Sequence, residues 1–87
     1  MDINQLMSQV KKKIEKNISI QSLSVEDKTF LHKNHASHTA GKFHIKLRIK
    51  SNELNKISKI EATKKIYKIL DQEMKEHIHS LQVLINS

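Results

Sequence analysis

The stretch FHIKLRIK, residues 43–50, decides the fold, because apolar side chains alternate in it with histidine, lysine and arginine. Successive side chains of a β-strand point to opposite faces, so the two kinds separate onto two faces. The apolar face consists of Phe43, Ile45, Leu47 and Ile49, and the other face of His44, Lys46, Arg48 and Lys50. We therefore predict a half-buried strand with a core on one side and a basic surface on the other.

On the N-terminal side of this strand, two further patterns supply structural elements. An apolar stripe with helical spacing runs from Ile3 to Ile14, behind a capping box that Asp2 and Gln5 can form. A run of period two follows and predicts a second strand, with a slip at residues 21–22 that favours a bulge. The apolar positions of this second strand are Ile18, Ile20, Leu23 and Val25.

On the C-terminal side, Ser58 and Glu61 form a second capping box, which opens a helix that we expect to continue to about Glu76. One short helical turn fits residues 51–54, between the alternating strand and this helix. The last strand has apolar residues at period two from Leu81 onward, and His79 shares their parity. The predicted buried stripe of the helix consists of Ile60, Ile66, Tyr67, Ile69, Leu70 and Met74.

The predicted order of elements is helix, strand, strand, short helix, helix, strand. A three-stranded sheet with the helices on one face is the economical way to bury their apolar stripes. We therefore expect an α+β fold in a single domain that spans residues 1–87.

The composition narrows the class of protein. Without cysteine, the chain has neither a disulfide framework nor a cysteine-based zinc site, which fits a reducing compartment. No apolar run approaches the roughly 20 residues of a membrane span, and the N-terminus lacks a secretory signal, so we expect a cytoplasmic protein with no membrane association. The formal net charge of +7 favours anionic partners. Basicity alone is weak evidence for nucleic-acid binding, because nearly all the cations are lysines and aromatic residues are few.

Six histidines in a cysteine-free chain are the most informative chemical feature. A metal or cluster bound here would use imidazole as its main ligand and would take any thiolate from a partner. His32, His35 and His38 lie in a polar segment and could bind zinc or nickel alone only if that segment folds back suitably. His79 is either a buried, hydrogen-bonded core residue or a ligand.

Four parts of the sequence together resemble the BolA family, in the same order and with the same spacing. The likeness covers nearly the whole chain, and the strand 44–51 and the strand with His79 are its most specific parts. The chain departs from the family pattern at residues 28–29, at Ile45, at Lys56 and at residues 62–64. The four parts are VEDKTFLH at residues 25–32, HIKLRIKS at residues 44–51, Glu73, and IHSL at residues 78–81.

The resemblance implies a class II KH-like fold and a partner, a monothiol glutaredoxin, with which BolA proteins share a bridged [2Fe–2S] cluster. In such complexes glutaredoxin and glutathione supply the thiolates, so the cluster is bound only in the complex. The BolA ligands match His79, which opens the last strand, and His32 in the loop after the first strand, with His35 as an alternative. Neutral histidines in such a Rieske-type set raise the cluster's potential. We expect the free protein to be a monomer or a weak homodimer.

A second hypothesis is a DNA-binding transcriptional regulator, a role reported for some BolA proteins through their KH-like face. KH domains hold the nucleic-acid backbone with a Gly-x-x-Gly loop, which this sequence lacks. An enzyme is the poorest hypothesis, because the chain has no cysteine nucleophile, no Gly-x-Ser-x-Gly turn and no Gly-rich phosphate loop. Non-specific, salt-sensitive phosphate contacts are open to Lys46, Arg48, Lys50, Lys64, Lys65 and Lys68.

Overall fold

The computed structural model describes residues 1–29 and 42–86. The predicted order of elements is confirmed, except that the long last helix is divided into two. No helix within these two ranges is long and apolar enough to cross a membrane. In chain order the elements are helix α1 (Ile3–Asn17), strands β1 (Ser22–Asp27) and β2 (Phe43–Lys50), a 3₁₀ turn η2 (Leu54–Lys56), helices α2 (Lys59–Ile69) and α3 (Asp71–Glu76), and strand β3 (Ile78–Ile85).

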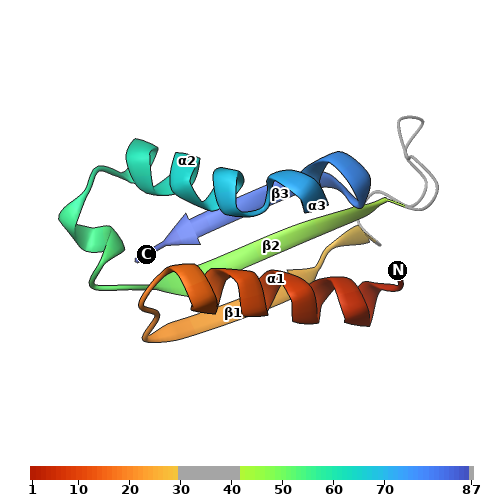
Figure 1. The fold of residues 1–87 in the computed structure, drawn as a ribbon, viewed down its shortest axis with the longest axis horizontal. Coiled ribbons are helices and arrows are strands. Elements are labelled where there is room, and N and C mark those ends of the chain that lie inside the picture. The colour runs from red at the N-terminus through yellow and green to blue at the C-terminus, as the bar shows by residue number, and fades with distance from the viewer. Residues whose placement is uncertain (30–41, 87) are drawn as a thin grey trace.

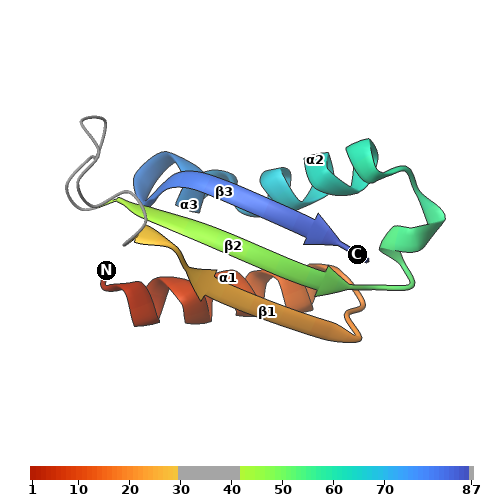
Figure 2. The same ribbon diagram turned by 180° about the vertical axis from the view of Figure 1, so that it is seen from behind.

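The three strands form one mixed sheet with β2 in the middle. β1 runs antiparallel to β2, with Leu23 opposite Ile49, and β3 runs parallel to β2, with Ile85 opposite the same residue. Figures 1 and 2 show that all the helices lie on one face of this sheet. The predicted α+β arrangement, with helices on one face of three strands, is therefore confirmed. β1 begins only at Ser22 and pairs with β2 in regular register, so the predicted bulge at residues 21–22 is wrong, and Ile18 and Ile20 lie before the strand.

The core lies between the sheet and the helices. Ile45, Leu47 and Ile49 of β2 are all buried, as their alternation predicts. The capping box of α1 is also confirmed, because Gln5 N–H donates to Asp2 Oδ1 at 2.8 Å and Asp2 N–H donates to Gln5 Oε1 at 3.0 Å. The helices add to the core Leu6, Val10, Ile14, Ala62, Ile66 and Leu70.

The predicted helix over residues 58–76 is interrupted at Leu70. This residue has φ −98° and ψ 18°, outside the helical region, and the chain resumes as α3 at Asp71. The prediction of a buried Ile60 is wrong, because Ile60 is 70% exposed. Ile66 is buried as predicted, but the buried line of α2 continues through Ala62, and Ile60 lies two residues before Ala62, about 200° around the helix axis. Tyr67 is also 37% exposed.

Glu73 of α3 is fully buried, although it carries a carboxylate. Lys13 Nζ of α1 lies 2.7 Å from Glu73 Oε2, and Gln9 Nε2 donates to the same oxygen. Burial by itself raises the pKa of Glu73, but the hydrogen bonds from Lys13 and Gln9 outweigh it and hold the pKa below its usual value. A buried charged contact therefore joins the first helix to the last.

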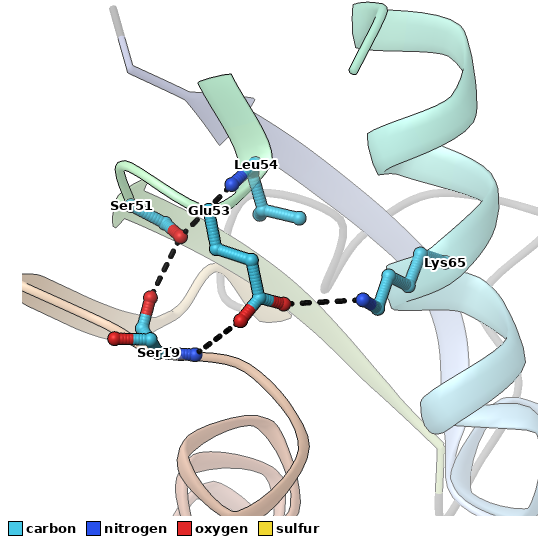
Figure 3. Close-up of polar contacts among 5 residues, drawn as sticks. All are labelled: Ser19, Ser51, Glu53, Leu54 and Lys65. Atoms are coloured by element: carbon cyan, nitrogen blue, oxygen red, sulfur yellow. Dashed lines mark hydrogen bonds and ion pairs between the residues drawn. The ribbon is translucent and has the colours of Figure 1, made fainter. Parts of the chain in front are cut away.

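A hydrogen-bonded corner follows β2 (Figure 3). Ser51 Oγ donates to Ser19 C=O at 2.7 Å and accepts from Leu54 N–H at 3.2 Å. Glu53 accepts from Ser19 N–H at 3.2 Å and from Lys65 Nζ at 3.1 Å. The Ser19 N–H contributes most, and Lys65 next, to a pKa of Glu53 below its usual value. The corner joins the segment before β1 to the end of β2 and to α2.

Candidate functional site

His79 lies in a β-bulge at the start of β3. Phe43 is opposite Ile78 and His44 is opposite Ser80, so His79 is an extra residue with no partner on β2. The bulge changes the side-chain parity, because Ile78 and Leu81 are both buried while His79 is exposed. The interpretation of His79 as a buried core residue is therefore wrong, since alternation with Leu81 does not extend through the bulge.

His44 packs beside His79 from the neighbouring strand. It is only 5% exposed, although it lies on the face of β2 opposite to the buried Ile45. His44 Nδ1 lies 2.6 Å from Ser80 Oγ, within hydrogen-bond distance. The His44 and His79 rings meet edge to face, with centroids 5.0 Å apart and 68° between their planes. The bond to Ser80 orients the His44 ring, which in turn limits the positions open to the His79 ring.

Hydrogen bonds between β2 and the residues that flank β1 and β3 hold the backbone around this site. His44 N–H donates to Thr29 Oγ1 at 3.1 Å, and Lys28 N–H donates to His44 C=O at 2.7 Å. Phe43 N–H donates to His77 C=O at 2.9 Å, which ties the start of β3 to the start of β2. The exposed His79 side chain therefore stands on a backbone that the whole sheet positions.

The remaining histidines do not complete a metal site in the described part of the chain. The predicted loop ligands His32 and His35, together with His38, lie outside the described residues, so their role stays a prediction. His77 is half-buried at the end of α3, with its Nε2 3.6 Å from Glu76 Oε2. Within residues 1–29 and 42–86, no group of three histidine, aspartate or glutamate side chains could hold a metal ion. His79 therefore offers one imidazole to a site that other ligands must complete.

The six predicted phosphate-contacting residues do not form one surface. Three lie on β2, where they alternate with the buried Ile45, Leu47 and Ile49, and three lie on α2. Figures 1 and 2 show that α2 covers the face of the sheet on which those buried residues lie. Two of the six already contact carboxylates, because Arg48 Nε donates to Glu26 Oε2 at 3.2 Å and Lys65 Nζ donates to Glu53 Oε2 at 3.1 Å. The strand set is Lys46, Arg48 and Lys50, and the helix set is Lys64, Lys65 and Lys68.

Sequence reasoning missed Ser80 and the bulge. The sequence does contain a signal for the bulge, because Ile78 and Leu81 are both apolar but lie three positions apart. In a regular strand, two such residues point to opposite faces. A single extra residue between them restores a common face, and that residue is His79 or Ser80. Without the pairing partners on β2, the sequence does not choose between these two positions.

Comparisons with known proteins agree with this fold. The family model described as BolA-like protein matches residues 14–86. The BolA domain of SufE1 from Arabidopsis thaliana is 27% identical, with a TM-score of 0.78, and the match covers 98% of this chain and 92% of that one. BolA1 from Arabidopsis thaliana is 19% identical, with a TM-score of 0.78 and coverage of 92% and 88%.

BolA1 from Mus musculus is 16% identical, with a TM-score of 0.73, and the match covers 93% of this chain and 65% of that one. No curated protein matches the sequence. The family model nevertheless spans most of the chain, and the helices and mixed sheet match those of solved BolA structures. The chain therefore belongs to the BolA-like family.

Proposed function

We propose that this chain is the partner of a monothiol glutaredoxin and co-ligates a bridged [2Fe–2S] cluster, for cluster trafficking or iron sensing. In this proposal His79 supplies one ligand, and His32, or His35 in its place, supplies the other. Glutaredoxin and glutathione supply the thiolates, because the chain has no cysteine. The family to which the chain belongs, together with the site around His79, supports this proposal over an enzymatic role.

The observation that carries the proposal is the exposed imidazole of His79 on a backbone held by three strands. A ligand that is shared with a second protein must reach outward, and it costs less to bind when its position is already ordered. His44 packs against the His79 ring, and the His79 side chain nevertheless remains exposed. Neutral imidazole is a known substitute for thiolate in [2Fe–2S] centres, where it raises the potential.

The test is reconstitution of the cluster in the mixture and in the chain alone. We expect the chain, glutaredoxin, glutathione, iron and sulfide to give a visible circular dichroism spectrum distinct from that of the glutaredoxin homodimer. The chain alone should stay colourless, because two imidazoles cannot complete the ligand set of a [2Fe–2S] cluster. A mixture with the homodimer's spectrum, or stable visible absorbance in the chain alone, would contradict the proposal.

A second candidate, non-specific DNA binding, has a specific observation in its favour. Lys46 and Lys50 lie on the sheet face that no described helix covers, and neither contacts a carboxylate among the described residues. Ser22 lies directly across from Lys50 and Ser24 directly across from Arg48, so hydroxyl groups accompany the cations. These groups can contact phosphate but present no planar set of donors for reading bases.

We expect any DNA affinity of this face to depend steeply on salt. If the three cations of β2 each contact one phosphate, affinity falls roughly 40-fold between about 50 and 200 mM salt, since each contact releases counterions. Lys50→Gln should reduce the slope of log affinity against log salt concentration by the amount of about one phosphate contact. Lys11→Gln, on the exposed side of α1, should leave this slope unchanged. Fluorescence anisotropy with duplexes of two unrelated sequences measures both effects. A sequence-dependent affinity that persists at high salt would contradict non-specific binding.

A further inference from the structure

The outer edge of β3 is a second surface whose use the proposed function does not explain. β3 is an edge strand of the sheet, and the described residues place no strand on its other side. Asn86 N–H donates to Ile49 C=O at 2.7 Å, and peptide groups along a parallel strand alternate between its two sides. The peptide groups of Val83 and Ile85 therefore point away from β2, toward this outer edge.

Among the described residues, a side chain caps the first half of this edge. Tyr67 Oη of α2 donates to Leu81 C=O at 2.8 Å, which satisfies one outward-pointing carbonyl. Further along β3, the first two turns of α2 and the strand enclose a groove of about 100 Å³. The groove is lined by Lys59, Thr63, Val83, Leu84 and Ile85. The outward peptide groups of residues 83–85 thus lie beside a hollow rather than beneath a helix.

On the α2 side, the groove is bordered by a rim that combines lysines with an exposed apolar side chain. A second depression of about 300 Å³, lined by Lys59, Ile60, Thr63 and Lys64, adjoins the first through the two residues that they share. Ile60 is 70% exposed there, although isoleucine is normally buried. No carboxylate among the described residues pairs with Lys59 or Lys64. The rim therefore carries two uncompensated positive charges beside an exposed aliphatic side chain.

We propose that this groove binds an extended, acidic segment of a partner protein, which adds to the sheet as a fourth strand along residues 83–85. Backbone pairing with the open edge would supply affinity, and alternate side chains would supply specificity. Apolar side chains of the segment would contact Ile60 and Val83, and carboxylates would face Lys59 and Lys64. A second copy of this chain fits poorly, because a net charge of +7 on each copy opposes association through a lysine rim.

The test uses the full chain and the labelled peptide EVEVEVE as the probe, at about 150 mM salt so that long-range charge effects are screened. We expect fluorescence anisotropy to show saturable binding, and amide shifts in NMR spectra to map it to β3 and α2. Lys59→Glu with Lys64→Glu should weaken binding by about tenfold or more, since both contacts become repulsive. Lys11→Glu with Lys12→Glu on α1 makes the same change in net charge and should have little effect.

Two altered probes test the backbone and the charge separately. A version of the peptide in which every amide is N-methylated has no N–H donor for pairing with a strand edge, so its binding should be lost. The peptide KVKVKVK should not bind, because its charges repel the rim. Ile60→Ser should weaken binding of EVEVEVE several-fold, whereas Ile57→Ser, outside the groove, should not.

Three results would overturn the proposal. The first is an equal loss of peptide binding in the double lysine-to-glutamate variants of α1 and of α2, which would indicate general charge attraction. The second is binding of a short oligo-dT strand, weakened by Lys59→Glu with Lys64→Glu, in place of peptide binding, which would assign the groove to nucleic acid. The third is self-association of the chain, measured by sedimentation, that is disrupted by Lys59→Glu with Lys64→Glu but not by the peptide EVEVEVE.

Discussion

Replacing His79 with alanine should abolish the spectrum of the heterodimeric cluster while leaving the fold intact. His79 is exposed in a bulge with no partner residue on β2, so truncation removes the proposed ligand without opening a cavity in the core. No neighbouring imidazole on the strands is a ready substitute, because His44 is 5% exposed and bonded to Ser80. Titration with cluster-loaded glutaredoxin, followed by visible circular dichroism, measures the loss, and far-ultraviolet circular dichroism checks the fold.

The matched control is His77→Ala, which removes a half-buried histidine two positions away on the same segment. We expect this variant to assemble the cluster as the wild type does. His32→Ala should weaken assembly only in part, because the proposal allows His35 to take its place. Wild-type cluster formation by His79→Ala would remove the central claim of the proposed function. Loss of the signal in His35→Ala, with an intact signal in His32→Ala, would reassign the loop ligand.

The second large effect concerns stability rather than the cluster. We expect Lys13→Met to lower the free energy of unfolding by about 3 kcal/mol, because it leaves the buried carboxylate of Glu73 without its charged partner. This value is at the lower end of the range for a broken buried ion pair, since the Lys13 side chain is 33% exposed and Gln9 still donates to Glu73. Urea unfolding with linear extrapolation measures the change.

The control for this effect is Lys12→Met, the adjacent and exposed lysine of the same helix, which should change stability by no more than about 0.5 kcal/mol. Combining Lys13→Met with Glu73→Leu should recover most of the loss, because an apolar pair of similar volume carries no desolvation cost. Equal effects of the two single lysine variants, or no recovery in the double variant, would show that the buried ion pair is not the cause.

Because of the Glu73 carboxylate, we expect the stability of the fold to decrease at acid pH. The folded state holds the pKa of Glu73 below its ordinary value of 4.5, so the folded state binds this proton less readily than the unfolded chain. The stabilisation is therefore complete above pH 4.5 and is lost as the pH falls through the folded-state pKa. The Tm of the wild type should fall more steeply on acidification in this window than the Tm of Glu73→Gln. Parallel slopes for the two proteins would contradict this assignment.

Several features could be predicted from local spacing because local spacing causes them. The alternation at residues 43–50 places Ile45, Leu47 and Ile49 on one face of any extended strand. The capping box of Asp2 and Gln5 closes within four residues, so no distant contact is needed to form it. The sheet with helices on one face then follows, since each apolar stripe needs a surface to cover it.

Local spacing did not predict the orientation of α2. Apolar spacing alone suggested that Ile60 and Tyr67 belong to the buried stripe of α2. In the structure, Ile66 and Leu70 are buried as predicted, together with the unpredicted Ala62, and α2 leaves Ile60 on the surface. This orientation is set by the packing of Ala62, Ile66 and Leu70 against the core, and the Lys65–Glu53 hydrogen bond accompanies it; both are contacts between segments. A periodic pattern does not contain that information.

The sequence by itself determined the kind and order of the elements, the family to which they belong, and the absence of any thiolate ligand in the chain. Only the tertiary structure decided that His79 is exposed, that Glu73 is buried against Lys13, and that the predicted basic residues divide between two surfaces. The physical reason is the range of the interactions. Helical and strand periodicity arise from neighbouring residues, whereas a bulge, a buried ion pair and the face of a helix are set by the partner strand or helix packed against them.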